Sequence, residues 1–228
     1  MKQTELELKA LRDELDKMWK LVLSQLEKSK LAFMNHDIER AHEIIRREKR
    51  VNAFDSKIDS DCENYIALYA PVAIDLRLVL SLIKISNTLE RIADFADSMA
   101  RQVLDDDFPA LEEELKEKLR LDEIFDTVIA MLYNCFITLE SENTKLSGKI
   151  LATDDFVDKL YYNGLFVLAE YTASKPSKEI AAYALKIMLV LRKLERVGDH
   201  CSNIVEEIVF YIDAKVLKHT SPKKRNLE

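Results

Sequence analysis

Glycine and proline are scarce in this sequence, with 3 glycines and 4 prolines among 228 residues. Strand-rich proteins need turn-forming residues at many corners, so this scarcity argues against a strand-rich fold. Long helices joined by few turns need far fewer residues of these two types. The composition therefore favours an all-α protein.

Cysteine patterns and long apolar runs are also missing. Cys62, Cys135 and Cys201 form no C-x-x-C pair and follow no zinc-ligand spacing, and an odd, unpatterned set is typical of a reducing cytosol. The first residues lack the apolar core of a signal peptide, and no apolar run of about 20 residues occurs that would cross a membrane. We therefore expect a cytoplasmic protein with no membrane span of its own.

Motifs of the common enzyme classes are absent as well. The sequence contains no Gly-rich phosphate loop, no G-x-S-x-G nucleophile elbow and no H-E-x-x-H zinc motif. The formal net charge is −7, so the chain has no overall field that attracts nucleic acid. We expect neither an enzyme nor a nucleic-acid-binding protein.

What the sequence does contain is helical periodicity. Hydrophobic residues make up 48% and charged residues 33%, which suits a folded, soluble domain. We expect Asp37 to cap the second helix, Pro71 to end it and to lie in the first turn of the third, and residues 221–225 to form a frayed polar tail. Apolar residues recur at intervals of three and four over the ranges 5–34, 37–68, 72–104, 111–139, 147–171 and 177–217.

One six-residue pattern occurs twice. Leu-Glu-Arg-Ile-Ala-Asp at residues 89–94 returns as Leu-Glu-Arg-Val-Gly-Asp at residues 194–199, an offset of 195 − 90 = 105. Pro71 and Pro176 are separated by the same interval, and a fixed offset of this kind indicates a duplicated unit. We predict two tandem three-helix bundles, residues 1–106 and 107–228, each with a Glu-x-x-x-Asp pair on its third helix.

Acidic side chains gather on one stripe of each predicted third helix. Residues at i, i+4 and i+7 share a helix face, and the middle helices carry facing acidic rows that begin at Glu48 and Asp154. Oxygen ligands without cysteine favour hard ions such as Mg, Mn or Ca, and carboxylate bundles also hold iron. The candidate metal ligands are Glu90, Asp94, Asp97, Glu195, Asp199, Asn203, Glu48 and Asp154.

Other interpretations of these rows stay open. A lone Glu-x-x-x-Asp pair is most often a solvated surface, although its recurrence in both units favours a site. Facing carboxylates repel, and Arg91 and Arg196 are candidates to neutralise them in place of a cation, which leaves a metal-free helical scaffold. A carboxylate-bridged di-metal enzyme would need Glu-x-x-His on two helices, and only residues 39–42 match.

The duplicated Leu-Glu-Arg-[Ile/Val]-[Ala/Gly]-Asp motif, preceded by Pro-x-x-x-x-Leu-Arg at residues 71–77, resembles the PhoU family of bacterial phosphate-uptake regulators. The resemblance covers nearly the whole chain and implies pseudo-twofold symmetry between the bundles. It implies motifs that hold multinuclear clusters of iron or other divalent ions, and the ion stays open among Fe, Mn, Mg and Zn. It also implies a cytoplasmic, often dimeric regulator that acts with the phosphate ABC transporter and its sensor histidine kinase to repress the phosphate-starvation response.

Carried over by position, the resemblance assigns the metal-binding role to the Glu and Asp of each motif copy. Glu48 and Asp154 occupy places where the family tends to have an acidic residue on the middle helix. The sequence departs from the family pattern at Ala93, where glycine is usual, and replaces the third carboxylate, Asp97, by Ser202 in the second unit. Metal occupancy is therefore expected to differ between the bundles.

Overall fold

The computed structural model describes residues 3–217 of the chain. These residues contain no strand, which confirms the predicted all-α class. The helices, in chain order, are α1 (Gln3–Asn35), α2 (Ile38–Tyr69), α3 (Ala73–Val103), α4 (Glu113–Lys118), α5 (Leu121–Glu140), α6 (Ser147–Ser174) and α7 (Lys178–Asp213), with a 3₁₀ turn at Thr144–Leu146.

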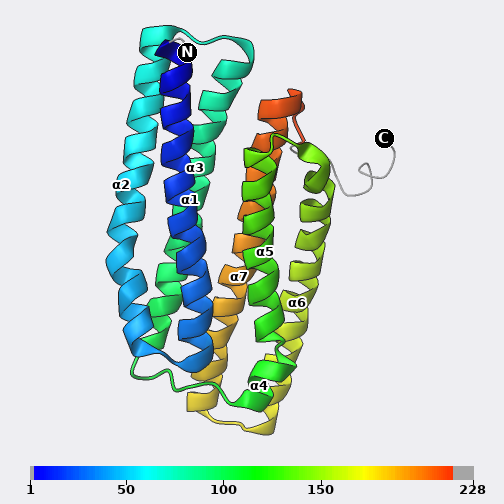
Figure 1. Cartoon of the computed structure of the whole chain (residues 1–228). Helices are drawn as coiled ribbons and strands as arrows, with labels where there is room; N and C mark the ends of the chain where they lie inside the picture. Colours follow the sequence, from blue (N-terminus) through cyan, green and yellow to red (C-terminus); the bar gives the residue numbers. More distant parts are fainter. Residues whose placement is uncertain (1–2, 218–228) are drawn as a thin grey trace.

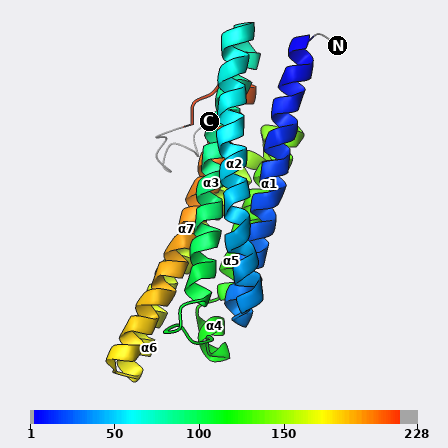
Figure 2. The same ribbon diagram turned by 90° about the vertical axis from the view of Figure 1, so that its left-hand side faces the viewer.

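Two antiparallel bundles lie side by side (Figure 1). The first consists of α1, α2 and α3, and the second of α5, α6 and α7, with the short α4 in the connection between them. α3 and α7 run in opposite directions and pack against each other between the bundles, as Figures 1 and 2 both show. The predicted pair of tandem three-helix bundles is confirmed.

Corresponding residues of the two repeats meet where α3 and α7 pack. The ring of Phe95 stacks on that of His200 with centroids 5.6 Å apart, and these positions differ by 200 − 95 = 105, the offset of the repeat. A contact between equivalent residues is what a twofold axis through the interface requires. The pseudo-twofold axis that relates the two bundles therefore passes near the Phe95–His200 pair.

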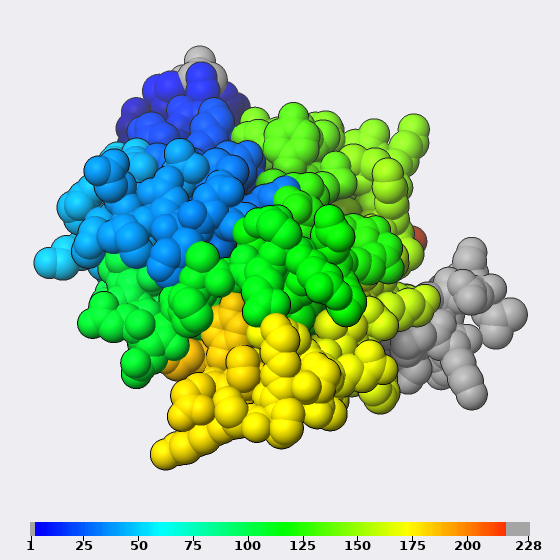
Figure 3. Space-filling view, turned by 90° about the horizontal axis from the view of Figure 1, so that it is seen from below, coloured from blue at the N-terminus to red at the C-terminus, as the bar shows by residue number. Residues whose placement is uncertain are grey.

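The buried apolar side chains form one continuous core through both bundles. Phe108, in the connection after α3, is almost fully buried, and its ring lies 5.7 Å from that of Phe33 on α1 and 5.4 Å from that of Tyr183 on α7. Seen from below, the connecting segment lies between the end of the first bundle and the α6–α7 turn (Figure 3). The predicted boundary at residues 106–107 falls in this segment.

Several helix ends agree with their sequence signals. The Asp37 side chain accepts a hydrogen bond from the backbone N–H of Arg40 at 2.9 Å, which is the predicted N-cap. α2 ends at Tyr69, and Ala70 takes a left-handed conformation with φ of 43° just before Pro71. The prediction that Pro71 lies in the first turn of the third helix is wrong, because α3 begins two residues later at Ala73.

Two predicted helices differ from those in the structure. The range predicted as one helix from 111 to 139 is divided at Arg120, whose φ is 53°. The left-handed Arg120 separates α4 from α5, and Leu119 and Leu121 on either side of it are both buried. α7 ends at Asp213 rather than at residue 217, since Ala214 is left-handed with φ of 56°. The predicted frayed tail at 221–225 lies outside the described residues.

Candidate functional site

The first carboxylate cluster lies between α2 and α3. It consists of Glu48 and Asp55 on α2 and Glu90, Asp94 and Asp97 on α3. Burial raises the pKa of Glu90, and the negative charges of Asp94 and Asp55 raise it further. Burial also raises the pKa of Asp94, followed by the charge of Glu48. The structure thus brings the predicted α2 and α3 rows together as an assembly of like charges.

Part of this cluster has hydrogen-bond and ion-pair partners within the chain. Ser86 Oγ and Asn87 Nδ2 donate hydrogen bonds to Asp55 at 2.6 and 3.1 Å. Arg101 Nε lies 2.6 Å from Asp97 Oδ2. Within residues 3–217, Glu90 and Asp94 have no ion pair of this kind, so these two carboxylates remain available to an external positive group.

The second carboxylate cluster, Asp154 and Asp158 on α6 with Glu195 and Asp199 on α7, is more deeply buried. Burial raises the pKa of Asp154 to about 6, against the hydrogen bond that Ser202 Oγ donates to its Oδ2 at 2.8 Å. Burial raises the pKa of Asp158 and of Glu195 as well, and in both cases the charge of Asp199 adds to the effect. Glu195 is the buried member of this cluster, whereas Asp154, Asp158 and Asp199 are partly exposed.

Glu195 has one satisfied and one orphaned oxygen. Its side chain is only 11% exposed. Oε1 accepts a hydrogen bond from Arg192 at 2.7 Å, whereas the buried Oε2 has no hydrogen-bond partner in the described chain. A buried carboxylate oxygen left unpaired costs free energy, of the order of 1 to 3 kcal/mol. This oxygen is the clearest unfilled position in either cluster.

The arginines that contact the clusters agree only in part with those expected. Arg192 and Arg101 make the close contacts, at i−3 of Glu195 and i+4 of Asp97. Arg196 lies 3.5 Å from Asp199, and in the described part of the chain Arg91 makes no ion pair with a carboxylate. Of the two arginines expected to neutralise the rows, Arg196 thus pairs with Asp199, while Arg91 pairs with no carboxylate of the described residues.

Gly198 lies where α7 passes close to the Asp154 side chain. A Cβ built there would stand 2.8 Å from Asp154 Oδ1 and 3.4 Å from Val157 Cγ1. Glycine thus allows α7 to approach the Asp154 carboxylate closely. At the corresponding position of the first bundle the chain has Ala93, and there the middle helix carries the longer Glu48.

The ligand atoms of the two clusters are of the type that binds a hard cation, but their side chains do not converge on one point. All donors are carboxylate oxygens with hydroxyl or amide neighbours, the ligand type preferred by Mg, Mn and Ca and also used for iron. Among residues 3–217, no three His, Cys, Asp or Glu side chains converge closely enough to hold a metal ion. Asn203 is exposed and makes no side-chain hydrogen bond there. Because Glu195 Oε2 has no hydrogen-bond partner, the second cluster fits a cation better than the first.

The two motif copies meet across the α3–α7 interface. His200 is buried, and this burial, followed by the charges of Arg196 and Arg91, lowers its pKa to about 4. One arginine from each motif thus acts on the same imidazole, which is neutral near pH 7. The structure places the two clusters on either side of a neutral, aromatic contact.

Comparison with known proteins identifies the family. A family model described as the PhoU domain matches residues 15–103 and 121–208. The chain belongs to the PhoU family. Both matched segments include a motif copy, so the PhoU family model and the internal repeat divide the chain in the same way.

Relatives match over almost their whole length. A phosphate-specific transport system accessory protein PhoU homolog from Aquifex aeolicus is 29% identical over 219 residues, covering 96% of this chain and 97% of that protein. PhoU from Escherichia coli is 30% identical, covering 93% and 86%. The crystal structure of PhoU from Pseudomonas aeruginosa has a TM-score of 0.83 at 27% identity and covers 93% of this chain and 100% of that one.

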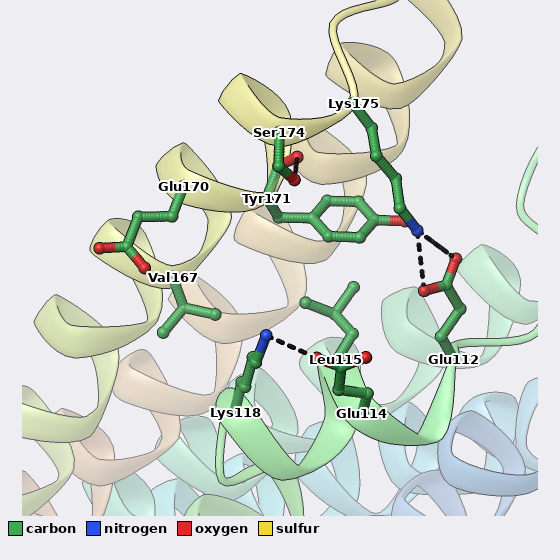
Figure 4. Close-up of a pocket in the computed structure, with 9 residues that line it drawn as sticks. All are labelled: Glu112, Glu114, Leu115, Lys118, Val167, Glu170, Tyr171, Ser174 and Lys175. Atoms are coloured by element: carbon green, nitrogen blue, oxygen red, sulfur yellow. Dashed lines mark hydrogen bonds and ion pairs between the residues drawn. The ribbon is translucent and has the colours of Figure 1, made fainter.

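A polar cavity of about 290 Å³ lies between α4 and the end of α6, away from the PhoU motifs (Figure 4). Lys175 Nζ lies 3.0 Å from both oxygens of Glu112, and Tyr171 OH donates to the same carboxylate at 3.2 Å. Lys118 is paired with Glu114 at 2.7 Å. Both lysines of the cavity are neutralised, so it offers a phosphate ion no uncompensated positive charge.

Within residues 3–217, no helix combines the length and the apolar character that crossing a membrane requires.

Proposed function

We propose that this chain is a non-enzymatic accessory protein of phosphate-specific transport. It represses phosphate uptake and the starvation response when phosphate is plentiful, by binding a sensor histidine kinase and subunits of the phosphate ABC transporter. It works in the cytoplasm as a homodimer and binds no nucleic acid. Family membership and the names of the Aquifex and Escherichia relatives support an accessory role in phosphate transport.

The observation that carries the proposal is the pair of incompletely neutralised carboxylate clusters. Holding like charges together lowers stability, and a bound positive group would relieve that cost. In the second bundle Glu195, Asp199 and Asp154 would hold a cation, and in the first Glu90, Asp94 and Glu48. A bound cation would supply positive charge there. The chain's own residues would fix the relative position of the middle and third helices, and hence the surface shown to a partner.

The two alternatives are a metal-free helical scaffold and a carboxylate-bridged di-metal enzyme, and the structure supports them unequally. The pairing of Asp97 with Arg101 favours a metal-free scaffold, since it shows internal neutralisation at one position. The di-metal enzyme has less support: Glu39 and His42, its one Glu-x-x-His match, are both exposed on α2 rather than in a bundle core.

Removing one carboxylate from each cluster tests metal binding. We expect the double variant Glu90→Gln with Glu195→Gln to bind divalent metal at least about tenfold more weakly, because each change removes an anionic donor. Metal content is measured by elemental mass spectrometry on protein purified without chelator. The control changes two exposed acids, Asp13→Asn with Glu117→Gln, and should keep the metal. Wild-type protein that carries no metal would favour the scaffold.

The regulatory role is tested in the host. Deleting the gene is expected to switch on a reporter of phosphate-starvation genes in phosphate-rich medium, and the wild-type gene should restore repression. Complementation with the Glu90→Gln, Glu195→Gln variant then asks whether repression depends on the clusters. A reporter that stays silent in the deletion strain would contradict the regulatory proposal.

A further inference from the structure

The outward side of α6 is apolar although it faces solvent. In Figure 1 this helix lies at the outer edge of the second bundle, away from the first. Phe166 is 72% exposed and Tyr162 59%, unusual values for aromatic side chains. The residues on this side step by 3, 4, 3 and 4, the spacing of a helix–helix contact. We name them the outer α6 face: Lys159, Tyr162, Phe166, Ala169 and Ala173, with Glu170 beside them.

An apolar groove continues this face toward α7. Its volume is about 640 Å³, and the side chains that line it come from α6 and α7. Leu185 on its α7 side is 57% exposed. The groove and the outer α6 face together form one apolar surface, and surfaces of this kind mark sites of protein association. Its lining includes Leu165, Ala169, Ala173, Ala181, Leu185 and Met188.

The internal repeat shows that the fold does not require this surface. Buried residues of α2 and α6 correspond at an offset of 106, as for Val51 and Val157 (157 − 51 = 106). At the same offset, Tyr162 corresponds to Ser56 (162 − 56 = 106) and Phe166 to Ser60 (166 − 60 = 106). Both serines are exposed. The first bundle thus folds with small polar residues where the second has large aromatic ones.

We propose that the outer α6 face binds the same face of a second copy of this chain. Two α6 helices crossing antiparallel about a twofold axis near residue 164 place Tyr162 opposite Phe166 of the other copy (162 + 166 = 328). The same arrangement places Lys159 opposite Glu170 of the other copy (159 + 170 = 329). Each contact occurs twice, as a twofold interface requires, so the face is complementary to itself in both shape and charge.

The charges at the two ends of the face favour a second copy as the occupant. Within residues 3–217, Lys159 and Glu170 are exposed and neither makes an ion pair. One lies at each end of the aromatic pair, so antiparallel pairing brings opposite charges together and parallel pairing does not. This interface specifies the homodimer of the proposed function, but it does not depend on the metal or on the regulatory role.

Replacing the aromatic pair by the residues of the first bundle tests the interface. Sedimentation velocity over a range of concentrations should show a monomer–dimer equilibrium for the wild type. Tyr162→Ser with Phe166→Ser should weaken dimerisation about a hundredfold or more, since central aromatic anchors carry most of the affinity. The control Leu68→Ser changes a residue that is 76% exposed at the end of α2 and should leave the dimer intact. Circular dichroism and thermal melting should show that all variants fold.

Charge exchange tests the antiparallel geometry. Lys159→Glu alone and Glu170→Lys alone should each weaken self-association about tenfold, because each sets like charges opposite one another. An equimolar mixture of the two variants should regain wild-type affinity, since a dimer with one chain of each kind restores both pairs. This recovery would not occur if the charges acted only within one chain.

A wild-type chain that stays monomeric at every concentration overturns the proposal and leaves the face to a different protein partner. A dimer that persists in the Tyr162→Ser, Phe166→Ser variant overturns it as well, because the interface then lies elsewhere. Dimerisation through this face together with an unresponsive phosphate reporter would refute the regulatory proposal alone.

Discussion

Replacing Phe108 by alanine lowers the free energy of unfolding by about 3 to 5 kcal/mol, the range for truncating a buried aromatic side chain. Phe108 lies in the connection between the bundles, where its ring contacts Phe33 of the first and Tyr183 of the second. The truncation leaves a cavity at the point where the two halves share their core. Because that core is continuous, both halves should unfold together in wild type and variant.

Urea denaturation followed by circular dichroism measures this effect as a shift of the midpoint at constant slope. The matched control is Asp106→Ala, an exposed neighbour in the same segment, which should stay within about 0.5 kcal/mol of wild type. A loss of less than about 1 kcal/mol for Phe108→Ala would mean that the ring does not join the bundles as described.

Asp154→Asn makes the metal-free protein more stable by roughly 2 kcal/mol above about pH 6. Burial raises the pKa of Asp154 to about 6 in the folded state, so the folded protein favours the neutral acid. The stability that this group contributes is present below its unfolded pKa and is lost as the pH rises through about 6. Asparagine stays neutral throughout and can still accept the hydrogen bond of Ser202. Its advantage should therefore shrink toward zero as the pH falls to about 4.

Thermal and urea unfolding across this pH range, after treatment with chelator, measure the difference between variant and wild type. Asp155→Asn is the control, since it removes the same charge from an exposed neighbour and should show a much weaker pH dependence. An Asp154→Asn advantage that does not change with pH would contradict the assignment of the effect to the Asp154 carboxyl group.

Strong periodicity explains why the helices could be predicted from the sequence. The seam through Leu82, Leu89 and Ala96 of α3 repeats in α7, and both helices are buried along it. The break at Arg120 lacked the usual signal, because no glycine marks its left-handed conformation.

The acidic residues of the site could be predicted from the sequence, whereas most of the arginines that contact them could not. The repeat located Glu90 and Glu195, because a fixed offset is visible in a sequence. Which arginine contacts Glu195 depends on side-chain conformation, since Arg192 and Arg196 are both within one helical turn of it. The burial of Phe108 depends on contacts with distant helices, and nothing in the acidic segment before it indicates a core residue. Local sequence patterns therefore predict which face of a helix a residue lies on, whereas contacts between side chains are known only from the three-dimensional structure.

The stacked Phe95 and His200 make clear what joining the two repeats in one chain allows. A symmetric assembly of separate single-bundle subunits would have to present the same residue from both sides of its axis. Covalent linkage removes that restriction, so one half can evolve an aromatic hydrocarbon ring while the other keeps an imidazole. It also keeps the halves at a high effective concentration, so that their contact persists however dilute the protein becomes.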